Sequence, residues 1–265
     1  MKNVDEIQKF KDEVSYNINA ISSAEKFKEI SLDWIKEAGK LNWSYNFRWM
    51  DRPAIQFPND AWVMQEIIWD VKPDLIIECG VAHGGSIMYY ASLLAMIDLA
   101  DAASNSDVLD PTKPKRKVLG IDIDIRAHNR KEIIASPFIN WIELKEGSSI
   151  DAETIKWVEE YSKNYQNIMV ILDSNHTHDH VLGELNAYAK LVTKNSYCVV
   201  FDTIVEDMPA ELSDNRPWGP GNSPKTAVKE FLLQTNEFII DSKISDKLQI
   251  TVAPDGFLKR SSCDA

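Results

Sequence analysis

The periodicity of apolar positions changes near residue 73. Before that point, two stretches at 4–22 and 23–39 repeat apolar residues every three to four positions, which predicts two amphipathic helices. After it, short β-branched runs alternate with helical patterns. The predicted strands are 74–78, 117–122, 140–144, 167–173 and 196–202, and the predicted helices between them are 85–100, 126–135, 151–162 and 180–192.

Such an alternation of strands and helices predicts βαβ units, and therefore a mostly parallel sheet with helices on both faces. A last helix is predicted at 224–234, followed by strands at 238–241 and 247–253. Because few residues link these two strands, we expect them to pair as an antiparallel hairpin at one sheet edge. The expected fold is a Rossmann-like α/β sheet of seven strands. We assign 1–60 to a helical and aromatic extension and 61–265 to the main domain.

Two segments fall outside this pattern. The aromatic residues Trp43, Tyr45, Phe47 and Trp49 alternate along the chain, which predicts a half-buried extended strand or a lid. Packing in the core or in an oligomer and contact with a substrate both stay open for them. The stretch 101–117 is polar and contains proline, so we expect a surface loop.

Composition narrows the class of protein. The 265 residues carry a formal net charge of -12, which argues against a nucleic-acid binder because tracking phosphates needs a basic face. Three scattered cysteines, Cys79, Cys198 and Cys263, form no C-x-x-C pair and indicate reduced thiols in the cytoplasm. The charged N-terminus does not resemble a signal peptide, and no apolar run approaches the roughly 18 residues that span a bilayer.

A glycine-rich stretch follows the first predicted strand of the sheet. It reads E-C-G-V-A-H-G-G-S from Glu78 to Ser86. Gly80 permits a tight turn, and Gly84 and Gly85 let the backbone approach a ligand before the next helix begins. The stretch therefore predicts a cofactor loop, and its candidate contacts are Glu78, Gly80, Ala82, His83, Gly84, Gly85 and Ser86.

The spacing in this loop differs from the G-x-G-x-x-G of nicotinamide sites. An acid, a glycine and then a glycine pair is more typical of a site for S-adenosylmethionine (SAM). SAM carries a sulfonium and an ammonium group but no phosphate, so a carboxylate such as Glu78 would attract it and would repel a pyrophosphate. Five parallel strands closed by an antiparallel hairpin also describe the class I methyltransferase fold.

The ends of the next two strands add further cofactor candidates. Asp122 ends the second strand and could accept hydrogen bonds from both ribose hydroxyls, with Asp124 as the alternative. Gly147 and Ser148 follow the third strand and could border the adenine ring. For Ser148 and Asp151, capping of the next helix is the competing interpretation.

Acidic residues also end the fourth and fifth strands. Asp173 and Asp202 would lie at the same sheet edge, and two carboxylates that close together repel unless a proton or a cation lies between them. Mg²⁺ suits two carboxylates and water, so we expect it to bind Asp173 and Asp202. Separate helix caps or solvated acids are the competing interpretation. His176 lies three residues beyond Asp173, and imidazole suits a general base near neutral pH.

The histidines of S-N-H-T-H-D-H also raise the possibility of a zinc hydrolase. The run departs from the H-x-H-x-D-H spacing by one residue, and none of the five histidines follows His180, so later histidine ligands are missing. We therefore expect His176 to be functional, and His178 and His180 to be ordinary polar residues that open the next helix.

Several blocks taken together resemble the family labelled cephalosporin hydroxylase, over about residues 45–260. These blocks include R-P-A-I-Q-F-P-N-D, G-I-D-I-D-I-R-A-H-N-R and L-D-S-N-H-T-H-D-H-V. The resemblance implies a SAM-dependent, Mg²⁺-linked O-methyltransferase related to macrolide-sugar methyltransferases. It also implies SAM at the Gly80–Ser86 loop, ribose on Asp122, Mg²⁺ on Asp173 and Asp202, base catalysis by His176, a sugar or glycan precursor as acceptor, and a homo-oligomer.

One position departs from that family. Its members with a characterised metal site carry Glu-Asp after the fifth strand, whereas this chain has Phe201 before Asp202. Thr203, Glu206, Asp207 or additional water are the possible replacements for the missing oxygen ligand. Three other functions compete with methyl transfer: a nicotinamide oxidoreductase, a non-haem iron oxygenase and a non-catalytic SAM-binding protein.

Overall fold

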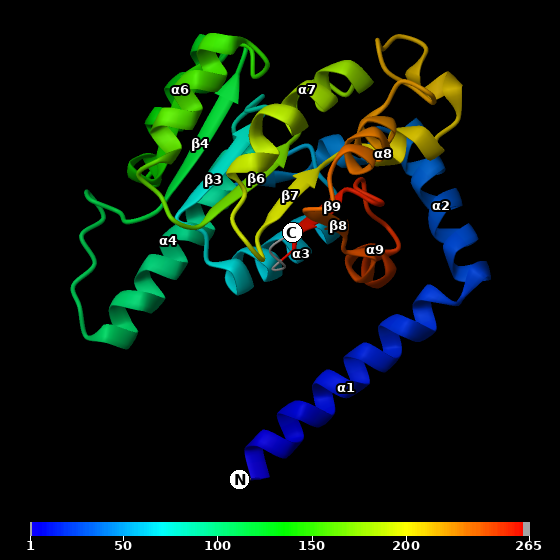
Figure 1. Cartoon of the computed structure of the whole chain (residues 1–265), viewed down its shortest axis with the longest axis horizontal. Coiled ribbons are helices and arrows are strands. Elements are labelled where there is room, and N and C mark those ends of the chain that lie inside the picture. The colour runs from blue at the N-terminus through cyan, green and yellow to red at the C-terminus, as the bar shows by residue number, and fades with distance from the viewer. Residues whose placement is uncertain (1, 262–265) are drawn as a thin grey trace.

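The computed structural model describes residues 2–261, and Cys263 lies outside them. A seven-stranded sheet forms its centre, in the order β5-β4-β3-β6-β7-β9-β8, with helices packed on both faces (Figure 1). The strands are β3 (Leu75–Cys79), β4 (Lys117–Asp122), β5 (Ile142–Glu146), β6 (Ile168–Leu172), β7 (Tyr197–Val200), β8 (Phe238–Ile240) and β9 (Phe257–Arg260).

The first five strands are parallel, as the alternating pattern predicts. β3, β6 and β7 are buried along their whole length. Their near-continuous apolar runs follow from this, since a strand covered on both faces cannot alternate. The chain order reverses beside β3, so the carboxyl ends of β3, β4 and β6 border the same crevice.

The predicted strand at 247–253 is wrong. The first residues of this predicted strand belong to helix α9 (Ser242–Leu248). The seventh strand of the sheet lies later in the chain, at β9. β8 and β9 are antiparallel neighbours, as expected, but α9 rather than a short turn connects them. The segment after α9 is tied to buried Asp60, which accepts hydrogen bonds from the Thr251 hydroxyl and from the Val252 amide at 3.0 Å.

Helices form a layer on each face of the sheet. Apolar residues of α3 (Pro58–Val71), α4 (Gly85–Asn105) and α5 (Ala127–Ile134) share one core cluster with one face of the strands. Those of α6 (Ala152–Ser162), α7 (His178–Tyr188) and α8 (Pro224–Gln234) share a second cluster with the other face. The sequence predictions missed α3 and α9.

Short 3₁₀ helices lie between the longer elements, at Ile139–Trp141, Ala189–Leu191, Thr203–Asp207 and Ala210–Ser213.

The N-terminal helices agree with the predicted pair. They are α1 (Lys2–Ser22), which projects from the body in Figure 1, and α2 (Glu25–Lys40). The aromatic segment is not one extended strand, however. It forms a 3₁₀ turn at Trp43–Asn46 and then a two-stranded ribbon, β1 (Arg48–Trp49) and β2 (Arg52–Pro53). The Asn46 amide donates to the Asn42 and Trp43 carbonyls, and these bonds close the turn.

Helix α4 begins at the glycine-rich loop. Among residues 2–261 it is the single helix that is long and apolar enough, by length and composition, to cross a membrane. The sequence analysis did not predict this property. However, 56% of that stretch is buried inside the molecule, and α4 packs against β4 and β5. Its apolar composition is therefore that of a core helix.

The polar segment 101–117 is only partly a loop, because α4 continues to Asn105 and β4 begins at Lys117. A buried ion pair holds the loop to α4: the Arg116 guanidinium donates to Asp98 and, at 2.8 Å, to Asp101. The other Asp98 oxygen accepts from the Trp141 indole at 2.9 Å.

We expect Arg116→Ala to lower the free energy of unfolding by about 3 kcal/mol, because it leaves the Asp98 carboxylate buried without its charge partner. Lys115→Ala removes a neighbouring exposed cation and should stay within about 0.5 kcal/mol of the parent protein. Urea unfolding of both variants tests this. Equal stabilities would mean that the ion pair contributes nothing.

Candidate active site

The glycine-rich loop lies in close contact with two other segments. Gly80 has φ +100°, and a Cβ there would lie 2.1 Å from the Asp173 carbonyl oxygen. A Cβ on Gly85 would lie equally close to the Pro53 carbonyl oxygen. Gly84 has φ +85°, a conformation that side chains disfavour. These glycines are therefore needed because backbone approaches backbone on both sides of the loop.

Three side chains hold this loop in place. One Asp122 oxygen accepts from the Val81 and Ala82 amides at 2.8 and 3.0 Å. The Arg52 guanidinium donates to the His83 carbonyl and, at 2.7 Å, to the Asn129 side chain. Asn129 in turn donates to the Ala82 carbonyl at 2.9 Å. The amides of Val81 and Ala82 and the carbonyls of Ala82 and His83 are therefore held by side chains.

A cavity of about 220 Å³ opens beside the loop, at the carboxyl ends of the strands. Four of its lining residues are among the predicted cofactor contacts: Gly80, Ala82, Asp122 and Ser148. Asp173, predicted to bind Mg²⁺, also lines it. A smaller cavity of about 50 Å³ adjoins it and is lined by His83, Gly85 and Ser86. Gly80, Ala82 and Asp173 line both cavities, which makes them two parts of one cleft.

Other predicted cofactor residues do not line this cleft. Glu78 is fully buried inside the sheet, and that burial raises its pKa well above the ordinary value. Asp124 is exposed and outside the cavity lining. Gly84 and Gly147 both have positive φ and shape the backbone.

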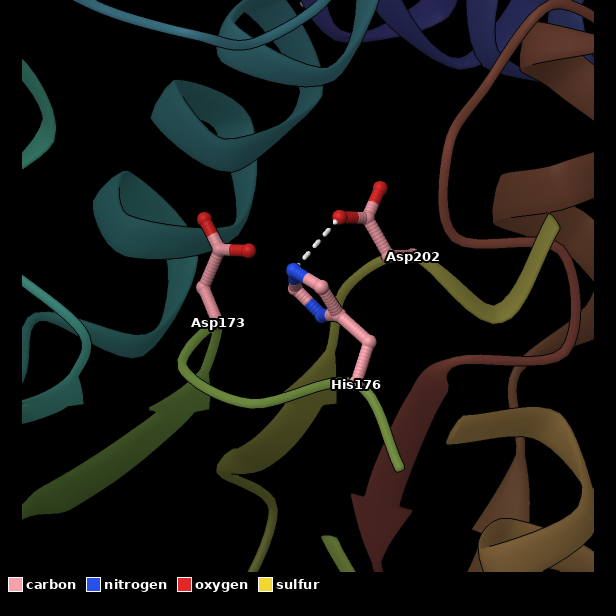
Figure 2. A group of neighbouring side chains, drawn as sticks. All are labelled: Asp173, His176 and Asp202. Carbon is pink, nitrogen blue, oxygen red and sulfur yellow. Dashed lines mark ion pairs between the residues drawn. The ribbon is translucent and has the colours of Figure 1, made fainter. Parts of the chain in front are cut away.

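A group of one histidine and two acids lies at the ends of β6 and β7. Figure 2 shows Asp173, His176 and Asp202 converging, with His176 Nε2 3.1 Å from an Asp202 oxygen. One ligand atom from each residue lies within 4.8 Å of the others. Asp202 has φ +55°, a left-handed conformation that aspartate tolerates better than most residues. The edge of Trp218 packs on His176 with ring centroids 4.9 Å apart.

The electrostatics of this group favour a cation. The pKa of Asp173 is raised from its ordinary value near 3.8 to about 7, mainly by burial and also by the neighbouring Asp202 charge, while His176 and a hydrogen bond with Gln56 oppose the rise. The two carboxylates therefore repel each other, and a divalent cation between them would relieve that repulsion. Oxygen donors of this kind fit Mg²⁺.

The residue before Asp202 adds no oxygen ligand to the group of Asp173, His176 and Asp202. Phe201 is 1% exposed and packs in the core. The three possible replacements are engaged elsewhere: the Thr203 hydroxyl donates to the Pro254 carbonyl, Glu206 accepts from Gly221 and Ser223, and Asp207 pairs with Lys225. Among residues 2–261, His176 is thus the third potential metal ligand in this group.

The three histidines of the 176–180 run separate in space. His176 joins the acidic group, whereas His178 contacts Thr226 at 2.8 Å and Glu230 at 3.1 Å on α8. His180 lines the larger cavity, a position that the sequence analysis did not predict.

A buried acid behind the cavity wall was also missed. Glu184 is fully buried and accepts from the Ser149 hydroxyl at 2.5 Å and the Ser174 hydroxyl at 2.6 Å, with His180 Nε2 3.3 Å away. Ser149, Ser174 and His180 all line the larger cavity. The spacing of His180 and Glu184, four residues apart on one helix, was the available signal.

Comparisons with known proteins agree with this geometry. Residues 41–261 match the model of the rhamnosyl O-methyltransferase/CmcI family. A rhamnosyl O-methyltransferase of Mycobacterium tuberculosis is 29% identical over 210 residues, which cover 77% of this chain and 74% of that protein. One of Mycobacterium leprae is 28% identical over 214 residues, covering 80% and 82%.

Solved structures share the fold. A structure of CmcI with Mg and SAM aligns with a TM-score of 0.54 at 18% identity, covering 82% of this chain and 78% of that one. A Staphylococcus aureus structure assigned as a caffeoyl-CoA O-methyltransferase aligns with a TM-score of 0.52 at 13% identity, covering 87% and 92%.

The fold and the family match define the class of protein as a class I methyltransferase. The chain belongs to the rhamnosyl O-methyltransferase/CmcI family and is an O-methyltransferase. The family resemblance, the fold class and the enzyme class predicted from sequence are thereby confirmed.

The raised pKa of Asp173 predicts a pH-dependent stability. Between about pH 4 and pH 7 the folded protein keeps a proton that the unfolded chain releases, so without divalent cations the free energy of unfolding should fall as pH rises through this range. Asp173→Asn should make this decline shallower. Urea unfolding from pH 4.5 to pH 8 in a chelator measures it, and an unchanged slope in the variant would contradict the assignment.

Proposed function

We propose that this protein transfers the methyl group of SAM to a hydroxyl of a sugar, in a glycan precursor or glycoside. Two curated relatives are named rhamnosyl O-methyltransferases, which supports a sugar acceptor. The observation that carries the proposal is the shared position of Asp173. It lines both parts of the cofactor cleft and also belongs to the group with His176 and Asp202.

The proposed cofactor contacts are residues that line the cleft. Gly80, Ala82, His83, Gly85 and Ser86 would face the methionine part of SAM. Asp122 lines the larger cavity, although its carboxylate also holds the loop amides, and it remains the proposed ribose ligand. Ser148 lies farther along the same wall, where adenine would bind.

The proposed metal ligands are Asp173 and Asp202. A divalent cation bound there would orient the acceptor hydroxyl and lower its pKa. His176 cannot use the same nitrogen lone pair both to bind a cation and to accept a proton. We assign His176 to the proton, since the neighbouring Asp202 carboxylate would stabilise the resulting imidazolium. The acceptor oxygen would then attack the methyl carbon in line while its carbon–sulfur bond breaks and S-adenosylhomocysteine is released.

The loop 218–224 borders the acceptor side. Trp218 contacts His176, and Asn222 accepts a hydrogen bond from the His178 amide at 2.9 Å. Ser223 caps α8 through a capping box. The loop is thus anchored at both ends beside the proposed base, where a sugar ring would stack on Trp218.

Two finer predictions concern the state of the protein in the cell. Cys79 and Cys198 are free and buried, which suits the predicted cytoplasmic location. Exposed apolar side chains on α1 and α2, among them Ile7, Phe10, Phe27 and Ile30, suit the predicted homo-oligomer.

The first test separates the base from the metal ligands. His176→Ala should lower methyl transfer from radiolabelled SAM to a rhamnoside by at least 10²-fold, because the proton has no acceptor, while SAM and Mg²⁺ binding by calorimetry stay within twofold. His178→Ala is the matched control and should keep its activity. Full activity of His176→Ala would refute the base assignment, and loss of Mg²⁺ binding would make His176 a ligand.

The second test concerns the cofactor wall. His180→Ala removes a polar group of the larger cavity and should raise the dissociation constant of SAM about fivefold, the effect of one hydrogen bond of about 1 kcal/mol. The value of kcat at saturating SAM should change little. Calorimetric titration measures the affinity. Unchanged affinity in His180→Ala would exclude the histidine from the cofactor site.

A further inference from the structure

The segment Q-F-P-N-D at 56–60 has a connection to each of the two acids of the proposed metal site. At its first position, the buried Gln56 side chain hydrogen-bonds Asp173. At its last position, Asp60 lies in the first turn of α3 with none of its surface exposed. Asp60 does not line the cofactor cleft and does not belong to the group around His176. The functions assigned above therefore leave this buried acid without a role.

Asp60 holds the segment that follows α9, which we call the strap (residues 250–254). One Asp60 oxygen accepts from the Thr251 hydroxyl, and the other accepts from the Val252 amide at 3.0 Å. The neighbouring Asn59 side chain donates to the backbone carbonyl at the start of the strap at 3.2 Å. The first turn of α3 therefore fixes the path of the strap over three successive residues.

The strap in turn holds the backbone that follows Asp202. The Ile204 amide donates to the Val252 carbonyl at 3.1 Å, and the fully buried Thr203 hydroxyl donates to the Pro254 carbonyl at 2.6 Å. Val252 thus contacts Asp60 through its amide and the Asp202 turn through its carbonyl. A single residue of the strap transmits the position of α3 to the turn that carries Asp202.

Asp202 needs such a constraint for two reasons. Its backbone is left-handed, with φ +55°, and a non-glycine residue keeps that conformation only where its surroundings enforce it. Its carboxylate also repels that of Asp173, which pushes the two side chains apart. The bonds from the strap to the two residues after Asp202 oppose both tendencies, because they fix the turn from the side of the core.

The contacts of Asp60 matter more here than its charge. Burial raises the pKa of Asp60 to about 7, and the charges of Asp202 and Asp173 add to the rise, so a neutral form is well populated near pH 7. The protonated acid can still donate to the Thr251 hydroxyl oxygen and accept from the Val252 amide. The link to the strap is therefore available in both protonation states.

We propose that Asp60 is a positioning residue of the metal site, which acts through the strap to hold Asp202 where Asp202 and Asp173 can bind one cation. This inference rests on the proposed function, because it concerns the cation assigned there. Asp60 touches neither cofactor nor acceptor in that assignment. Its effect should therefore appear in the affinity for the cation and not in the affinity for SAM.

Two substitutions separate contact from charge. Asp60→Asn removes the charge, but its amide can accept from Val252 and donate to Thr251, so the Mg²⁺ dissociation constant from calorimetry should stay within about threefold of the parent value. Asp60→Ala removes both contacts and should raise that constant at least about tenfold, with SAM affinity within about twofold. Equal weakening of Mg²⁺ binding by both variants would mean that Asp60 acts through its charge. That result, or unchanged Mg²⁺ affinity in Asp60→Ala, would overturn the proposal.

Asp98→Ala is the matched control for a general loss of stability. Asp98 is also a buried acid with two hydrogen-bond partners, Arg116 and Trp141, and it does not line the cleft. Its removal should leave both affinities within about twofold, and a loss of Mg²⁺ binding as large as in Asp60→Ala would contradict the positioning role. If Asp60→Ala does not fold, Thr251→Val removes one of the two contacts and should still weaken Mg²⁺ binding about threefold or more. Parent-like Mg²⁺ affinity in Thr251→Val would then refute the proposal.

Hydrogen exchange measured by mass spectrometry without metal tests the link itself, independently of methyl transfer. Asp60→Ala should speed exchange in 250–256 and also in 200–206, whereas Asp60→Asn should change neither segment. If only 250–256 responds to Asp60→Ala, the strap does not hold the Asp202 turn and the proposal is wrong. If exchange and Mg²⁺ affinity change as expected but the parent protein methylates no sugar, the proposed function fails and the positioning role stands.

Discussion

The close approach of Gly80 to the Asp173 carbonyl organises the rest of the site. β3 and β6 are adjacent parallel strands, and at their carboxyl ends the backbone of one passes where any side chain of the other would clash. Because the two chain segments share this wall, Asp173 lines the cofactor cleft and also lies within 4.8 Å of His176 and Asp202.

Charge is the second constraint on this crevice. Burial, together with the neighbouring Asp202 charge, raises the pKa values of Asp60 and Asp173 to about 7. A crevice that holds so much negative potential favours cations, and a sulfonium donor and a divalent metal are both cations. His176 is the basic group placed among these acids, and Asp202 keeps it oriented.

The ribbon β1–β2 lies between an apolar groove, which it forms with α3 and α4, and the glycine-rich loop. Its first strand lines the apolar groove. Its second strand contacts the glycine-rich loop through Arg52 and Pro53. The aromatic segment of the sequence thus packs in the core through Trp43 and borders the apolar groove through Phe47 and Trp49.

The sequence by itself determined the parallel sheet and the placement of the strand-end acids, because buried β-branched runs need partners on both sides and carboxyl ends of parallel strands share one edge. It misplaced the last strand and the aromatic segment, since apolar alternation over a few residues does not distinguish a strand from a 3₁₀ turn or from a segment anchored by Asp60. Only the tertiary structure decided that Glu78 is buried inside the sheet, where burial raises its pKa, that His180 lines the larger cavity and that Glu184 lies buried behind its wall. The packing of α7 against α8 and the sheet decides which way the side chains of α7 face. The local periodicity of the sequence does not predict that packing.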